Sequence, residues 1–350
     1  MNQARELAEE LSYQDVQKMI EQMLGKCSID FGAYVTSLLQ GKLPFSLEEM
    51  LHTLLRCVMA DFLEQKRMLL SIIIIAVMGA VFTSFSKLLQ GKQVAEMAFY
   101  AVYVLFFSIL LTVFTKMTAI AGDTLTKLLD FMKVLSPAYF SAMTFSQGSL
   151  SSGVYYEFTM AMITMADFVL VKFALPGIHI YFLLCIANQL SERELFTQMA
   201  KLLQDVIKFV MKSMFGIMMG INVVQGLVLP VTAQMQNSAV VRLSGSIPGI
   251  GNTISNVAGT ILCAGTLVKN AVGVAGVIVV ILFCGVPLLR LLVDKFLFCL
   301  LNAFLEPISD KRIISCFGAV AESIQMLIYA VFVGSMLFVV SIAIMSAMTR

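Results

Sequence analysis

Ionisable side chains inside otherwise apolar stretches are the residues of this sequence whose types and spacing could do chemistry. Asp167 stands in the string MITMADFVLV, Lys172 follows five residues later, and His179 lies beyond a Pro-Gly pair. A carboxyl group isolated among apolar residues could bind and release a proton or a cation during transport. The alternative is structural: Asp167 could pair with Lys172, with a polar group of a neighbouring helix or with interfacial water. We favour this interpretation, because structural ion pairs also perturb carboxyl groups, and we expect His179 to be a packing residue.

Patterns typical of catalysis are missing from the sequence. There is no GxxxxGK[ST] string for nucleotide phosphates and no HExxH string, and two histidines cannot supply a catalytic zinc site. An intramembrane aspartyl protease needs a second aspartate, for which Asp167 has no convincing mate. A Ser–His pair made from Ser149 or Ser244 with His179 rests on composition alone. We therefore predict that the protein is not an enzyme and carries no cofactor.

The seven cysteines are widely spaced and include no CxxC pair. This spacing favours small buried side chains over a metal site or a disulfide framework. The net charge is +2, with basic residues interleaved with acidic ones, so there is no electrostatic case for binding nucleic acid. We predict neither a metal nor a nucleic acid as a ligand.

The overall composition is that of a membrane protein. Hydrophobic residues make up 59% of the chain, charged residues 13%, and the mean hydropathy is +0.89. A soluble chain of 350 residues would need more charge to cover its surface. The partner that this composition predicts is the lipid bilayer.

Apolar runs long enough to cross a bilayer as helices follow one another from Met68 onward. They predict an all-α, polytopic helical membrane protein with about seven transmembrane helices. Because the third and fourth spans are joined by a tight connection around Lys172-Phe-Ala-Leu-Pro176-Gly177, this pair is expected to form a helical hairpin that does not fully cross. Residues 254–268 are short and rich in Gly, Ser and Thr, which predicts a re-entrant or interfacial helix. The predicted spans are 68–85, 95–121, 153–172, 173–190, 213–231, 271–292 and 326–348.

Residues 1–66 predict a small amphipathic helical amino-terminal domain, and residues 67–350 the polytopic transmembrane domain. Within the first, Ser28 could cap a helix, and Ser46–Glu49 is a capping box for a later one. Three further amphipathic segments lie between the spans and are expected to lie in the headgroup plane or across the span ends. They are Asp123–Leu135, Ser191–Lys212 and Asp294–Ala321.

A glycine-rich region follows the fifth predicted span. It contains Pro248, Gly251, Gly273 and Gly276, with Lys269-Asn270 between them. Small residues let helix backbones approach closely, so the region predicts tight packing in an oligomer or a hairpin. A permease with broken helices near its substrate would show the same features. Glycine content does not separate the two, and helix packing is the interpretation that we favour.

Three strings in these regions carry a family resemblance. They are Gln225-Gly-Leu-Val-Leu-Pro230, Ser246-Ile-Pro-Gly-Ile-Gly251 and Leu267-Val-Lys-Asn-Ala-Val-Gly-Val-Ala-Gly276. With them, the chain resembles the stage III sporulation protein AE family of endospore-forming Firmicutes over most of residues 68–350. The motif around Lys269–Gly273 is the most specific part of the resemblance.

The resemblance implies a role without catalysis. Members of this family look like the largest polytopic subunit of a secretion-like apparatus in the mother-cell membrane that surrounds the engulfed forespore. The assembly is thought to be a channel that keeps the forespore metabolically competent. The implied partners are other subunits of the stage III sporulation A-operon complex, including a separate ATPase and a ring-forming component, a forespore-side partner, and further copies of the chain.

A secondary permease that uses Asp167 as a coupling carboxylate is the alternative function. The sequence therefore nominates a set of candidate residues for a structural or functional role. These are Asp167, Pro230, Pro248, Gly251, Lys269, Asn270, Gly273 and Gly276.

Overall fold

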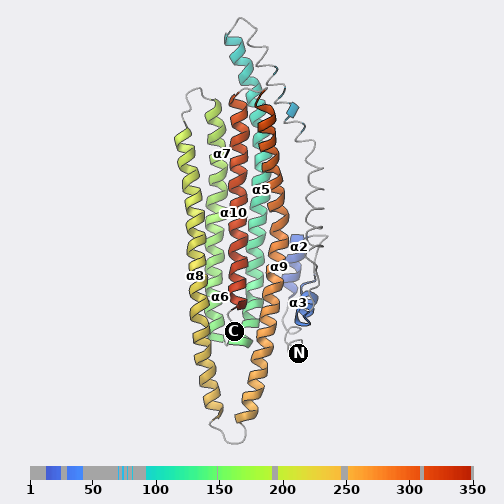
Figure 1. The fold of residues 1–350 in the computed structure, drawn as a ribbon, viewed down its shortest axis with the longest axis vertical. Coiled ribbons are helices and arrows are strands. Elements are labelled where there is room, and N and C mark those ends of the chain that lie inside the picture. Colours follow the sequence, from blue (N-terminus) through green and yellow to red (C-terminus); the bar gives the residue numbers. More distant parts are fainter. Residues whose placement is uncertain are drawn as a thin grey trace.

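The computed structural model describes a bundle of long helices (Figure 1). The described residues are 13–24, 30–41, 92–147, 149–190, 196–245, 251–307 and 311–347, together with positions 70, 73, 74, 77 and 81. Every element within these ranges is helical and no strand occurs among them, so the all-α prediction is confirmed.

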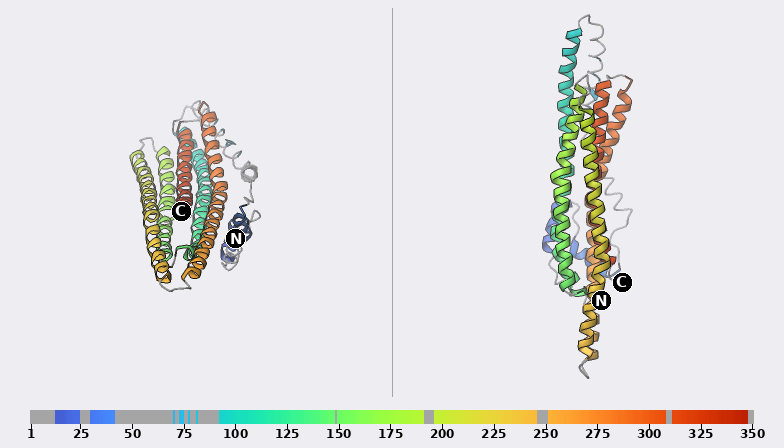
Figure 2. Two further views of the ribbon diagram at one scale, coloured as in Figure 1. Left: turned by 60° about the horizontal axis from the view of Figure 1, so that its bottom comes forward. Right: turned by 90° about the vertical axis from the view of Figure 1, so that its left-hand side faces the viewer.

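Within the described ranges, five long rods form the bundle. Three consecutive elements, α6, the π-helical η2 and α7, join end to end in one of these rods. In Figure 1 and in both views of Figure 2 the rods run beside one another, and α10 packs against α9, α5, α7 and α8. The elements are α2 (Gln14–Leu24), α3 (Phe31–Leu39), α5 (Lys92–Gln147), α6 (Ser149–Ala166), η2 (Asp167–Ala174), α7 (Leu175–Leu190), α8 (Thr197–Gly245), α9 (Gly251–Leu305) and α10 (Lys311–Ala347).

Each rod holds a segment long and apolar enough to cross a membrane. The segments are Tyr103–Thr144, Ser152–Gln189, Thr197–Gln225, Leu262–Leu305 and Lys311–Ile344. The helix α5 has 56 residues and is therefore about 84 Å long at 1.5 Å per residue, whereas a hydrocarbon core is about 30 Å thick. A rod of this length needs only part of itself to cross the membrane.

The predicted hairpin between the third and fourth spans is wrong, because that stretch is one continuous rod. Hydrogen bonds in η2 join residues five apart, as from the Leu175 N–H to the Leu170 carbonyl. Such a local π-helical adjustment lets Pro176, which has no N–H to donate, follow without ending the helix. Gly177 does not form a turn. It lets α7 pack closely against α8, since a Cβ there would lie 2.9 Å from Ile207 Cδ1 of α8.

The predicted interfacial segments are also parts of long helices. Asp123–Leu135 lies inside α5, residues 197–212 open α8, and Asp294–Ala321 takes in the end of α9 and the start of α10. The predicted re-entrant residues 254–268 lie near the beginning of α9. In α5 the helix continues because its core face does not end where the charged residues begin. That face goes on with the buried side chains of Leu125, Leu128, Leu129, Met132 and Leu135.

Two helices of the predicted amino-terminal domain are described. These helices, α2 and α3, pack against α5 and α9 of the bundle and bury their apolar sides. Asp30 caps α3, because its carboxylate accepts a hydrogen bond of 3.0 Å from the Ala33 N–H, which corrects the predicted cap at Ser28. The helix predicted after Ser46–Glu49 lies outside the described residues, as does span 68–85 apart from the isolated positions. The division at residue 66 stays a prediction.

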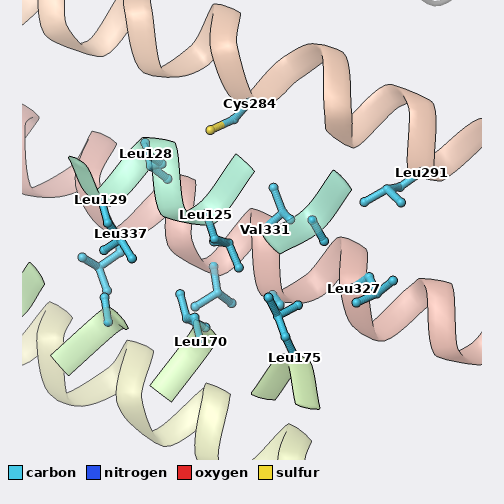
Figure 3. Close-up of a cluster of buried hydrophobic side chains, with 14 of the residues drawn as sticks. Leu125, Leu128, Leu129, Leu170, Leu175, Cys284, Leu291, Leu327, Val331 and Leu337 are labelled. Carbon is cyan, nitrogen blue, oxygen red and sulfur yellow. The ribbon is translucent and has the colours of Figure 1, made fainter. Parts of the chain in front are cut away.

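A packed apolar layer occupies the middle of the bundle. Figure 3 shows side chains from α5, η2 and α10 gathered in one cluster, among them Leu125, Leu170 and Val331. Gly334 of α10 lies at this level, since a Cβ there would be 2.7 Å from Leu125 Cδ2 and 3.2 Å from Leu170 Cδ1. We call the contact of Leu125, Leu170 and Gly334 the central layer, and it fixes the relative depth of three rods.

Candidate functional site

Two of the candidate glycines lie where α9 meets α5 and α10. A Cβ on Gly276 would lie 2.9 Å from Leu135 Cδ2, and a Cβ on Gly273 would lie 3.3 Å from Tyr139 Cε2 and collide with Ser346 Oγ. Any side chain at these two positions would therefore have to displace its neighbours. Close approach of this kind is what small residues allow between membrane helices. We call this contact of Gly273 and Gly276 with Leu135, Tyr139 and Ser346 the glycine seam.

Lys269 lies one helical turn before Gly273 and is fully buried, with 0% of its surface exposed. The neighbouring Asn270 is half-buried, and among the described residues its Oδ1 has no hydrogen-bond partner. An ammonium group inside an apolar bundle is costly, so such a residue marks either function or tightly fixed packing. Lys269 therefore belongs to the interior at the end of the glycine seam.

A second polar feature consists of two buried amides on α8. Asn222 donates its Nδ2 hydrogen to Ser341 Oγ of α10 at 2.9 Å. Gln225, one turn further along, is only 4% exposed, and neither atom of its amide has a hydrogen-bond partner among the described residues. Neither amide is among the candidate residues predicted from the sequence, where Gln225 is named only as the first residue of the string Gln225–Pro230 that carries the family resemblance. The available signal was two amides three residues apart in a long run of α8 without charges.

A third polar feature joins three rods through Glu322, the one acidic residue in the sequence of α10. Its carboxylate accepts a hydrogen bond of 3.1 Å from the Tyr181 hydroxyl of α7 and a further one from Gln204 Nε2 of α8. Lys208 Nζ of α8 lies 3.9 Å away. We call this group the Glu322 clamp. No sequence pattern points to any member of this clamp, because its members are far apart along the chain.

Asp167 and Lys172 form an ion pair on the outer side of the bundle. Asp167 Oδ2 lies 3.0 Å from Lys172 Nζ, and the side chains are 29% and 65% exposed. Their spacing of five residues matches the π-helical hydrogen bonding of η2, which places them one turn apart. This pairing within one helix is the structural interpretation of Asp167 that the sequence allowed.

His179 and the cysteines are further side chains of types that could bind a metal. His179 packs against aromatic rings, with its ring centre 5.7 Å from that of Phe114. In the part of the chain that the structure describes, no three His, Cys, Asp or Glu residues are grouped to hold a metal ion. The described cysteines, at positions 185, 263, 284, 299 and 316, are free thiols.

The candidate residues do not converge on one site. Along α10, Gly334 of the central layer and Ser346 of the glycine seam are separated by about 18 Å at 1.5 Å per residue. Asp167 lies beside the central layer, so it does not share a site with Lys269. Pro230 lies inside α8, Gly251 is the first residue of α9, and Pro248 lies outside the described residues.

The fold and its contacts define the class of protein. A bundle whose described part holds five helices long and apolar enough to cross a bilayer, joined by small-residue packing and by polar contacts between helices, is a polytopic helical membrane protein.

Comparison with known proteins then gives the family. Residues 29–349 match the family described as stage III sporulation protein AE, and the chain belongs to it. It is similar to the stage III sporulation protein AE of Bacillus subtilis (strain 168), with 22% identity over 307 residues, which cover 87% of this chain and 77% of the relative. No solved structure matches the chain.

Proposed function

We propose that this protein is a membrane-embedded scaffold or channel subunit of a sporulation-specific, secretion-like complex that links mother cell and forespore. Membership of the stage III sporulation protein AE family is the observation that carries the proposal. The subunit would reside in the mother-cell membrane around the forespore and would be needed for forespore development after engulfment.

The internal contacts of the bundle support a scaffold or channel wall. The glycine seam holds α9 against α5 and α10, and the Glu322 clamp ties α7 and α8 to α10. Contacts of this kind along the bundle favour one fixed body over a carrier in which one half rocks against the other. A chain without a P-loop string would depend on a separate ATPase for energy.

The proposed partners are the other subunits of the stage III sporulation A-operon complex, including that ATPase and a ring-forming component. A forespore-side partner and further copies of this chain complete the proposed assembly. In this assembly the chain would hold other subunits in place or form part of the channel wall, and no catalytic step is assigned to it.

A secondary permease remains the second candidate. The two features that suggested it were an isolated acidic residue, Asp167, and a helical hairpin, and the structure shows neither. Residues 153–190 form a continuous rod where a helical hairpin was expected. Asp167 is paired with an exposed lysine of its own helix. The permease therefore has less support than the scaffold or channel subunit.

The proposal is tested by in-frame deletion of the gene in its native host. Vegetative growth should be unaffected, and sporulation should stop after engulfment until the wild-type gene is returned. A Gly273→Leu gene should fail to restore spores, because the new side chain has no room beside Ser346 and Tyr139. A Gly220→Leu gene is the matched control, since Gly220 is exposed and no described atom lies within 4 Å of a Cβ at that position. Normal spores from the deletion strain would contradict the proposal.

A further inference from the structure

The outward face of α5 is polar from Thr112 to Lys133. Among side chains that the structure describes, no large hydrophobic residue is exposed between Leu105 and Val154. Lys127 and Asp130 add partly exposed charges on the same side. The exposed residues of this stretch are Thr112, Thr115, Lys116, Ala119, Asp123, Thr126 and Lys133. We call these residues, with Lys127 and Asp130, the α5 polar face.

The depth of the α5 polar face is set by the central layer. Leu125, on the opposite side of the same helical turns, contacts Gly334 of α10. Gly334 lies near the middle of residues 323–347, a stretch of α10 without Asp, Glu, Lys or Arg. The α10 side chains that are exposed at this depth are apolar: Phe332 is 44% exposed and Met336 38%. The polar face of α5 therefore lies at the depth where its neighbour presents hydrocarbon-compatible residues.

The length of the α5 polar face matches the thickness of a membrane. From Thr112 to Lys133 the helix rises about 32 Å at 1.5 Å per residue, close to the roughly 30 Å of a hydrocarbon core. Three lysines and two aspartates facing lipid over that distance would be costly. Lipid is therefore not the neighbour of this face.

Four of the five charges of the α5 polar face are balanced by one another, and the fifth, that of Lys116, is on an exposed side chain. Asp123 pairs with Lys127 at 2.9 Å, and Asp130 pairs with Lys133 at 2.8 Å. At the same depth on the adjoining rod, Asp167 pairs with Lys172. Side chains that pair among themselves and remain partly exposed do not require an opposite charge from a protein partner. Contact with water therefore fits this face better than burial against another protein surface does.

We propose that the α5 polar face lines a water-filled path across the membrane and that the same face of further copies of this chain closes the path. A single helix face cannot enclose water, whereas rotational symmetry turns one face of every copy toward a common axis. This inference rests on the proposed channel role and deepens it, because it names the wall of the conduit. Apolar faces such as that of Phe332 and Met336 remain on the lipid side.

The test is the labelling of single cysteines with a membrane-impermeant thiol reagent. All seven native cysteines are first replaced, and the full chain with its complex is kept in sporulating cells or in membranes from them. Cysteine is then introduced at Thr115 or Thr126, both exposed and uncharged positions of the α5 polar face. The matched control is Phe332→Cys, exposed at the same depth on α10. Because the thiolate is the reactive form and needs water, the two α5 cysteines should react at least about tenfold faster than the control.

The outcomes separate this inference from the proposed function. Equal, slow reaction at Thr126→Cys and Phe332→Cys in membranes, with full reaction after denaturation, would overturn the inference. So would disulfide cross-linking of Thr126→Cys to a cysteine in residues 68–85 or in another copy without reaction with the reagent, because the face would then be a dry contact. If the inference fails in this way while the deletion strain still stops after engulfment, the proposed function stands alone. Rapid reaction at Thr126→Cys with normal spores from the deletion strain would leave an aqueous path but refute the sporulation role.

Discussion

The Tyr103 hydroxyl of α5 donates a hydrogen bond of 2.7 Å to the Ile186 carbonyl of α7, across 83 residues of sequence. Cys316 Sγ of α10 lies 3.4 Å from the same hydroxyl, so three rods meet there. The glycine seam joins α5, α9 and α10 near the other end of α10. Specific contacts near both ends, with the Glu322 clamp and the central layer between them, explain why the rods form one bundle.

Gly276→Leu should destabilise the bundle. The new side chain would meet Leu135 and Ile342, and overpacking of this kind typically costs about 1–3 kcal/mol. The measurement is thermal unfolding of the detergent-purified protein. Gly220→Leu on α8 is the control, because no described atom lies within 4 Å of a Cβ there. If both variants melt alike, or if Leu135→Ala fails to restore part of the loss, the seam is not a tight contact.

Glu322→Ala should loosen α7 and α8 from α10. Each lost neutral-to-charged hydrogen bond is worth about 1.5–3 kcal/mol when buried, and less here because the carboxylate side chain is 51% exposed. Glu322→Gln should retain most of the stability, since its amide oxygen can still accept from Tyr181 or Gln204. A double-mutant cycle with Tyr181→Phe measures the coupling by chemical denaturation. A coupling energy of zero would contradict a stabilising hydrogen bond between Tyr181 and Glu322.

Asp167→Asn should leave sporulation intact. The Lys172 partner is 65% exposed, and an ion pair of this kind contributes about 0–1 kcal/mol. Spore counts after gene replacement give the readout, with Lys172→Gln as the matched variant. A permease with a coupling carboxylate would instead lose function with Asp167→Asn and keep it with Lys172→Gln. That pattern would favour the transporter over the scaffold.

Gln225→Leu should leave stability unchanged or raise it. The buried amide has no hydrogen-bond partner among the described residues, and removing an unsatisfied polar group recovers roughly 1–3 kcal/mol of desolvation cost. Asn222→Leu should lower stability, because it leaves Ser341 Oγ without its donor. Thermal unfolding of the two variants side by side decides the matter. A less stable Gln225→Leu protein would show that the amide does bond, to water or to another subunit.

Fold class and membrane character could be predicted from the sequence, because they depend on long-range averages of apolar residues. The boundaries of the spans could not be predicted, because a charged residue in the sequence looks like the end of a span even where the helix continues. In α5 the charges between Lys116 and Lys133 occupy one face while Leu125 and Leu128 keep the other face in the core. In the same way, Pro176-Gly177 in the sequence favours a break between two helices, although a π-helical stretch continues the rod through this point.

The polar contacts between rods could not be predicted from one sequence. Glu322 bonds to Tyr181, 141 residues away, and Asn222 bonds to Ser341, 119 residues away. No local spacing specifies such partners, which depend on how the rods are aligned. The glycines were different, because a small residue signals close approach whatever its partner is. The sequence could therefore nominate Gly273 and Gly276 but not Leu135 or Ser346.

The π-helical stretch also couples the rotational phase of α6 to that of α7. Its eight residues wind the chain more slowly than an α-helix would, so the faces that α6 and α7 turn toward α10 depend on that slower winding. Deleting one residue there would rotate everything beyond it by the turn of one residue, which is smaller in this stretch than the roughly 100° of an α-helix. Tyr181 of α7 would then swing away from Glu322 while α6 stayed in place, so one missing residue would undo the alignment of the α7 part of the rod.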